Sequence, residues 1–101
     1  MRMMIQASIP NEPFNTMVLN GTASATMGKV LETIKPEAAY FAEVDGKRTA
    51  FLIVNLESAS QIPVVAEPLF IKLNAECRMR PIMLAEDLAK ADLNKIGKMW
   101  S

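Results

Sequence analysis

Two strand-like runs, Ala38 to Val44 and Arg48 to Leu56, flank the turn-forming tripeptide Asp45-Gly46-Lys47. Asp-Gly between apolar runs favours a tight turn, because the central positions of that turn need a positive φ that these residues tolerate. The segment is therefore predicted to form a β-hairpin. The second run alternates between two sets, with Ala50, Leu52 and Val54 on one side and Phe51, Ile53 and Asn55 on the other. Since both sides are largely apolar, the sheet needs a cover on each face.

The same period of two predicts a strand at each end of the folded region. Apolar residues alternate with polar ones at Arg2 to Ile9 and again at Ala75 to Met83. Pro81 cannot donate a backbone hydrogen bond, so the last strand is predicted to lie at an edge of the sheet or to end there.

Asn11 to Ile34 is predicted to be one helix, although the turn signal Asn20-Gly21 weakens its middle. We favour one helix because Gly21, Ala25 and Gly28 would then share a face and let the backbone approach the sheet closely. The alternative is two shorter helices.

Ser60 is the predicted N-cap of another helix, in which apolar residues recur three and four positions apart as far as Leu73. Pro63 would fall in the first turn, where its missing N–H matters little. Pro68 would fall in the interior and is expected to kink the helix.

The remainder, Leu84 to Ser101, is predicted to be a short helix that frays after Lys95 unless a partner holds the tail. A chain of 101 residues has the usual size of one hydrophobic core, so residues 1–101 are expected to form a single domain.

These elements follow the order strand, helix, strand, strand, helix, strand. This βαββαβ order is that of the ferredoxin-like fold, an α+β architecture with two helices on one face of a four-stranded antiparallel sheet. The other face stays bare within one chain. A homodimer that pairs two bare faces, as in a dimeric α/β barrel, would cover both with one isologous interface. The alternative is that the C-terminal tail folds back over its own sheet.

The chain has no histidine and a single cysteine, Cys77. Histidine is the commonest acid or base near neutral pH, so Ser-His-Asp and Cys-His catalysis are excluded within one chain. A single cysteine excludes an internal disulfide and multi-cysteine metal sites, and no metal or cofactor is expected. It also suits a reducing cytoplasm, where we expect the protein to reside.

Eleven basic and eleven acidic side chains cancel. Without a broad cationic field, neither a nucleic acid nor an acidic membrane is an expected partner. No segment approaches the roughly 20 apolar residues that a membrane-spanning helix needs.

Arg78 and Arg80 are candidate ligand-binding residues. They occupy alternate positions of the last predicted strand, so they point the same way and present two forked donors that suit a carboxylate or phosphate. The alternative is a charged row that protects an edge strand from unwanted pairing. Tyr40 is a third candidate, because its phenol can donate to a ligand in a sheet-lined cavity; otherwise it packs in the core or an interface.

Glu67 is the candidate catalytic residue. It lies in the apolar stretch Val64 to Phe70, where partial removal from water would suit a general base. The alternative places Glu67 on the wet side of its helix. Cys77 lies among core-type residues with no histidine to activate it, and we expect a buried, inert thiol.

Four stretches of the chain carry a resemblance to known proteins: Ile9-Pro10-Asn11-Glu12-Pro13-Phe14-Asn15, Lys35-Pro36-Glu37-Ala38-Ala39-Tyr40-Phe41, Glu67-Pro68-Leu69-Phe70 and Glu86-Asp87-Leu88-Ala89-Lys90-Ala91. With the element order, and over roughly residues 1 to 92, they resemble a family of small bacterial proteins related to the dimeric α/β-barrel superfamily. That superfamily also contains muconolactone isomerases and antibiotic-biosynthesis monooxygenases. The resemblance implies the fold and a homodimer; catalytic histidines used elsewhere in the superfamily have no counterpart here.

The first functional hypothesis is a homodimer that binds a small, mostly apolar molecule between sheet and helices. The alternative is a cofactor-independent isomerase or monooxygenase acting on a small hydrophobic substrate through Glu67, Tyr40 and the arginine pair. A third hypothesis, RNA binding across the open sheet, needs exposed aromatic residues on the central strands, where Phe51 is the only one.

Overall fold

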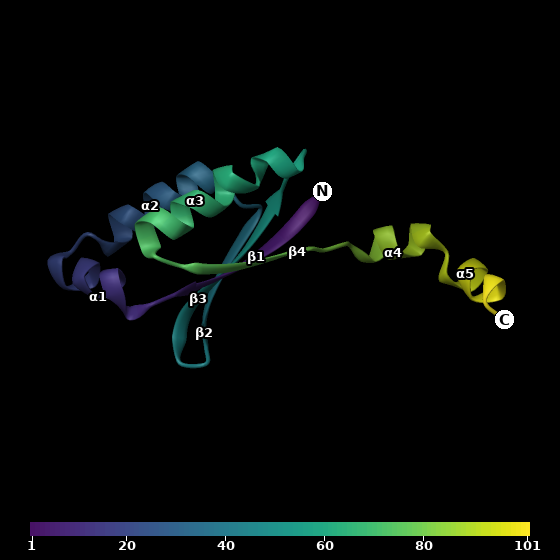
Figure 1. The fold of residues 1–101 in the computed structure, drawn as a ribbon, viewed down its shortest axis with the longest axis horizontal. Coiled ribbons are helices and arrows are strands. Elements are labelled where there is room, and N and C mark those ends of the chain that lie inside the picture. Colours follow the sequence, from purple (N-terminus) through teal and green to yellow (C-terminus); the bar gives the residue numbers. More distant parts are fainter.

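The computed structural model describes residues 1–101 as a four-stranded sheet, a pair of helices packed on one face of it, and a projecting C-terminal segment (Figure 1). The elements in chain order are β1 (Arg2–Ile9), α1 (Asn11–Asn20), α2 (Ala23–Ile34), β2 (Ala38–Val44), β3 (Lys47–Asn55), the short 3₁₀ turn η1 (Ala59–Gln61), α3 (Ile62–Leu73), β4 (Glu76–Pro81), α4 (Ala85–Ala91) and α5 (Leu93–Met99).

All neighbouring strands are antiparallel, and their order across the sheet is β2-β3-β1-β4. Helices α2 and α3 lie side by side over one face (Figure 1). The predicted α+β class with a four-stranded antiparallel sheet is confirmed, and the arrangement is compatible with a ferredoxin-like fold. The edge position predicted for β4 is confirmed as well.

The hairpin forms where the Asp-Gly pair predicted it. Asp45 and Gly46 have φ angles of 53° and 77°, the left-handed conformations that a tight hairpin turn requires. The Glu43 side chain accepts a hydrogen bond from the Gly46 backbone N–H at 2.6 Å, which satisfies a donor that the turn leaves free.

The single helix predicted over Asn11 to Ile34 is wrong: α1 ends at Asn20 and α2 begins at Ala23. Gly21 has a left-handed φ of 82° and ends α1. The Asn20 side chain accepts hydrogen bonds from the Thr22 backbone N–H and hydroxyl, which stabilises the turn. The predicted close approach of the glycines to the sheet is also wrong, because a Cβ added at Gly21 or Gly28 would meet nothing within 4 Å.

The core lies between α2, α3 and one face of the sheet. On β1 and β3 every second side chain points into this core. Helix α3 adds a row of buried side chains, although Pro68 lies inside the helix. The buried apolar residues are Met3, Ile5, Ala7 and Ile9 of β1, Ala50, Leu52 and Val54 of β3, Val30 and Ile34 of α2, Val65, Ala66, Leu69 and Leu73 of α3, and Leu56 and Ala75 from the connections. Helix α3 begins at Ile62, two residues beyond the predicted N-cap Ser60, because Ser60 lies inside η1 and α3 follows that turn directly.

The opposite face of the sheet has no helix over it, and we call it the open face. Register pairs Tyr40 with Phe51, Phe51 with Gln6, and Gln6 with Arg78, so these four side chains form one row across the sheet. The next row contains Ala38, Ile53, Met4 and Arg80. Phe51 and Ile53 are only half-buried, so the second apolar side of β3 lacks a full cover within one chain.

Residues 82–101 form a projecting segment that we call the C-terminal arm. Two short helices replace the single frayed one that was predicted, and α5 continues beyond Lys95 to Met99. The arm points away from the sheet (Figure 1), so it does not fold back over the open face as the alternative prediction had it. It stretches the molecule to 61 × 29 × 18 Å with a radius of gyration of 17.1 Å, against about 13 Å for a compact chain of this length.

None of the helices combines the length and the apolar character that crossing a bilayer requires.

Candidate functional site

A groove runs between the helices and the outer strand β2. Helices α2 and α3 cover the central strands, where the inward side chains from Met3 to Ile9 and from Ala50 to Val54 are buried, but β2 is an edge strand and lies beyond them. Phe41 points to the helix side of the sheet, because it pairs with the inward-facing Ala50. It nevertheless keeps 55% of its surface exposed, since no helix packs directly over it.

The groove consists of two adjoining hollows, of about 700 Å³ and 550 Å³, which share Phe14, Met27 and Phe41. We call it the β2 groove. The larger hollow continues along α1 and α2 past Val18 and Leu31, and the smaller one runs toward the hairpin. Apolar walls of this size suit a small organic ligand, because binding would remove exposed carbon surface from water.

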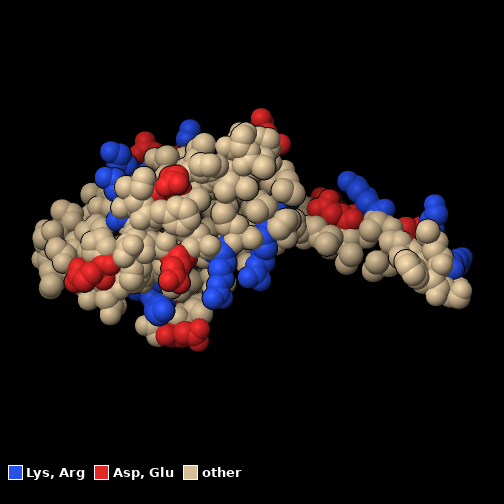
Figure 2. Space-filling model, viewed as in Figure 1, with Lys and Arg blue, Asp and Glu red and all other residues tan.

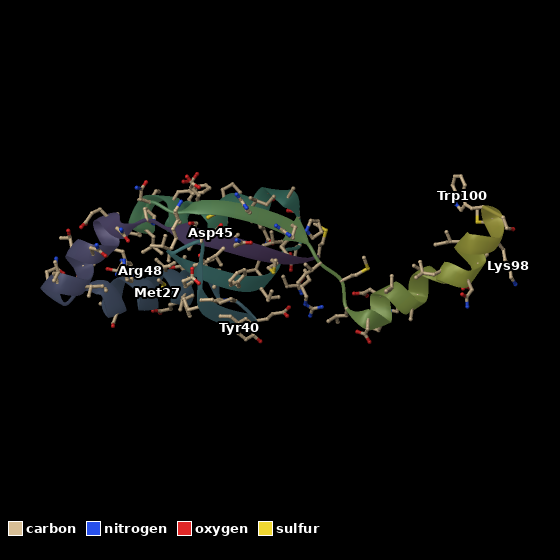
Figure 3. The ribbon with its side chains drawn as sticks, turned by 90° about the horizontal axis from the view of Figure 1, so that it is seen from below. Met27, Tyr40, Asp45, Arg48, Lys98 and Trp100 are labelled. Carbon is tan, nitrogen blue, oxygen red and sulfur yellow. The ribbon has the colours of Figure 1, made fainter.

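Arg48 lies at the hairpin end of the β2 groove, near Met27 (Figure 3). Its guanidinium stacks 4.9 Å from the centre of the Phe14 ring. Its Nη1 donates a 2.7 Å hydrogen bond to the Asn15 side-chain oxygen, a neutral acceptor. No carboxylate lies within 4 Å of it, since the one ion pair in the chain joins Arg2 to Glu37. The planar fork of Arg48 is therefore held in place at the end of an apolar channel without a counter-ion.

Two other charged side chains line the same end. Glu43 is the cross-strand neighbour of Arg48, and its carboxylate accepts the hydrogen bond from Gly46 in the turn. Lys47 adds a second cation. This mouth of the groove therefore holds two cations and one carboxylate, which leaves an excess of positive charge.

The three predicted ligand-binding residues lie on the open face, outside the β2 groove. Tyr40 is 64% exposed and occupies the β2 end of its row, whereas Arg78 occupies the β4 end. Three inter-strand steps of about 4.8 Å separate them by roughly 14 Å. Arg80 lies in the next row. The two arginines are neighbours, as their spacing predicted, but they do not converge with Tyr40 on one ligand.

Glu67 lies on exposed helix surface rather than in an apolar pocket. It lines a shallow cavity of about 330 Å³ between α2 and α3, together with Lys29 and Lys72. This cavity is on the helix side of the sheet, and Tyr40 is on the opposite side. A single protomer therefore does not bring Glu67, Tyr40 and the arginine pair together as the enzymatic hypothesis needs.

Cys77 projects from β4 toward the helices and is half-buried. Burial raises the pKa of its thiol from the ordinary value of 9.0 to about 11, because the thiolate would lose hydration. A raised pKa agrees with the prediction that the Cys77 thiol is unreactive.

We expect Cys77 to react slowly with a disulfide reagent such as 5,5′-dithiobis-(2-nitrobenzoate) at pH 8, and to react at least tenfold faster after unfolding in urea. The contribution of Cys77 to the free energy of unfolding should be constant below about pH 8, and then fall as the pH rises toward 11, because the unfolded thiol ionises first. The Cys77→Ala variant should lose this alkaline slope. Complete labelling of the folded protein within the mixing time would contradict the assignment.

Charge does not mark any other site. In Figure 2, Lys and Arg side chains are interspersed with Asp and Glu over the visible face, in keeping with a net charge of zero. No group of three or more His, Cys, Asp or Glu side chains is placed to hold a metal ion.

The residues that define the β2 groove, Phe14, Met27, Phe41 and Arg48, were not singled out from the sequence. The alternation of β2 separates Phe41 from Tyr40, so the sequence did carry the signal that these aromatics face opposite sides. The sequence gives no signal that Phe14 and Arg48 are in contact, because the two residues are 34 positions apart.

No protein-family model matches the chain, and no curated protein matches it at a significant level. The resemblance to dimeric α/β-barrel proteins therefore stays a prediction.

Proposed function

We propose that the protein is a homodimer that binds a small, mostly apolar molecule with an acidic end group in the β2 groove. The observation that carries the proposal is the position of Arg48, a cation that forms no ion pair, at the end of a channel walled by Phe14, Met27 and Phe41.

The apolar walls supply most of the affinity. Burying carbon surface contributes about 25 cal/mol per Å², so a ligand that removes 200 Å² of combined apolar surface from water gains roughly 5 kcal/mol before the cost of its immobilisation. Phe14 and Met27 pack partly on the core, so two walls of the groove are held in place before a ligand arrives. A preformed site loses little entropy on binding.

The acidic end group follows from the chemistry of Arg48. A guanidinium binds a carboxylate through two parallel hydrogen bonds, and this arrangement fixes orientation as well as adding energy. Stacking on Phe14 and the hydrogen bond to Asn15 restrict the side chain, so less freedom is lost when a carboxylate binds.

The open face supports the homodimer. An isologous pair of sheets can have its twofold axis along the strands, which sets β4 over β2 of the partner, or across them, which sets β4 over β4. The second arrangement brings Arg78 and Arg80 against two more arginines. The first sets them over Tyr40 of the partner, whose ring attracts a guanidinium. Electrostatics therefore favours an axis along the strands.

The binding proposal is tested by calorimetric titration with octanoate and with 1-octanol, which share a chain and differ in the acidic end. We expect octanoate to bind more tightly. Phe41→Ala should weaken both ligands by about tenfold or more, since it removes a wall. Arg48→Gln should weaken octanoate about tenfold and leave 1-octanol unchanged, because only the acid uses the guanidinium.

Tyr40→Ala is the matched control for Phe41→Ala, because it truncates the adjacent aromatic residue on the opposite side of β2. It should leave both affinities unchanged. Failure of octanoate to bind at millimolar concentration, or equal losses of affinity in the two alanine variants, would overturn the β2 groove as the site.

A further inference from the structure

The C-terminal arm consists of two helices that have almost nothing to pack against. Each spans seven residues, and each packs mainly against the other rather than against the sheet or the long helices. Helices this short are unstable in water by themselves, because too few hydrogen bonds offset the cost of nucleation. Their stability therefore depends on a surface outside their own protomer.

The arm also exposes most of its large apolar side chains. Leu93 and Ile96 share one side of α5, and Trp100, the residue that follows the helix, continues the same spacing of three and four positions. Trp100 is the only tryptophan of the chain, is 85% exposed and lies at the tip of the arm (Figure 3). The exposed set comprises Met83, Leu84, Leu88, Leu93, Ile96, Met99 and Trp100.

The charges of the arm argue against a membrane or a nucleic acid as the missing surface. They are three carboxylates and three ammonium groups, which cancel: Glu86, Asp87 and Asp92 against Lys90, Lys95 and Lys98. Helices that bind acidic lipid surfaces or phosphate backbones carry a cationic excess. A neutral apolar arm suits a protein surface.

The size of the open face argues for a second copy of the chain as that surface. Four strands about 4.8 Å apart, with β4 six residues long at about 3.4 Å per residue, make a flat face of roughly 400 Å². A stable protein interface buries about 800 Å² on each partner. Pairing of the open faces therefore supplies about half of what a lasting dimer needs, and the arm is the remaining unpartnered apolar surface on the same protomer.

The connection between β4 and the C-terminal arm directs the arm away from its own body. The Ile82 backbone N–H donates a 3.0 Å hydrogen bond to the Arg2 carbonyl, so the arm leaves the sheet directly from the end of β4 beside β1. A segment that starts at the sheet edge and projects past it leaves its apolar side chains unpartnered by its own body and available to a second protomer.

We propose that the C-terminal arm packs its apolar side on a second copy of this chain and completes the dimer interface. This inference rests on the proposed homodimer. Trp100 is thereby shielded from water in the dimer and exposed in the monomer.

The test follows oligomeric state and Trp100 emission in the same samples of the full chain. Sedimentation gives the dissociation constant, and acrylamide quenching with the emission maximum reports the exposure of Trp100. We expect emission to shift to shorter wavelength, and quenching to fall, over the concentration range in which dimer forms.

Ile96→Glu should weaken the dimer by about 30-fold, since a carboxylate enters the interface twice, and should leave Trp100 exposed. Asn94→Glu is the matched control, because it adds the same side chain two positions away on the other side of α5. Neither change should unfold the body, because Asn94 and Ile96 lie in α5, which packs on α4 rather than on the sheet or the long helices.

The outcomes separate the two proposals. A dimer in which Trp100 stays exposed, or in which both variants behave alike, would overturn the arm contact and leave the open-face dimer standing. A monomer at all concentrations would overturn both. Shielded Trp100 in a monomer would place the arm on its own body and overturn the intermolecular contact.

Discussion

Replacing Leu52 with alanine is expected to lower the free energy of unfolding by about 2 to 5 kcal/mol, the range for leucine truncation in a packed core. Leu52 is fully buried in the central strand β3, between Ile5 on β1 and Ala39 on β2. The sheet holds its backbone from both sides, so the space left by the side chain cannot close by collapse, and the lost contacts add to the lost burial.

The measurement is urea unfolding followed by circular dichroism, with Leu19→Ala as the control. Leu19 is 88% exposed on α1, so the same truncation there should change the free energy of unfolding by less than about 0.5 kcal/mol. Equal losses at both positions, or no loss at Leu52, would contradict the assignment of the core.

Most of the fold was predictable because its patterns are local. The alternation of apolar and polar residues predicted β1 with its observed ends, Arg2 and Ile9, and the Asp-Gly pair predicted the position of the hairpin turn. The break between α1 and α2 is a different case. Two forces competed at Asn20-Gly21, the continuing helical spacing and the turn chemistry of that pair, and the Asn20 side chain decided between them by hydrogen bonding to Thr22.

The candidate site was less predictable because it depends on which strand lies at the edge. Phe41 is exposed only because β2 is outermost and the helices stop short of it. The pairing of Arg48 with Phe14 likewise arises from a contact between α1 and the start of β3, two elements far apart in the sequence. Strand periodicity correctly paired Arg78 with Arg80 on one face, but it could not place Tyr40 at the far end of their sheet.

The C-terminal arm shows the same limit. Helical character after Leu84 was visible in the sequence, whereas the direction of the arm was not. Direction depends on the few residues that join β4 to α4, where Ile82 continues the pairing with β1 and carries the chain straight on. The number of apolar residues in the tail was compatible with either a fold-back or a contact with another chain.

Ile53→Glu is expected to dissociate the proposed homodimer while each protomer keeps its fold. Ile53 is half-buried at the middle of the open face, one position along β3 from the core residue Leu52. In an isologous interface the substitution occurs twice, and each buried carboxylate without a partner costs about 2 kcal/mol. The total of about 4 kcal/mol corresponds to a roughly thousand-fold weaker dimer. Within the monomer the carboxylate stays in water, so the unfolding transition of the dissociated protein should change little.

The measurement is the dissociation constant of the dimer by sedimentation, with Ile71→Glu as the control variant. Ile71 is 73% exposed on α3, on the helix side of the sheet, so the identical substitution there should leave the dimer intact. The pair separates the effect of position from the effect of adding charge, because both proteins carry the same net charge. A dimer that tolerates Ile53→Glu but not Ile71→Glu would mean that the helices rather than the sheets meet at the twofold axis. In that case the apolar outer side of β3 would face water, and the argument from its alternation would fail.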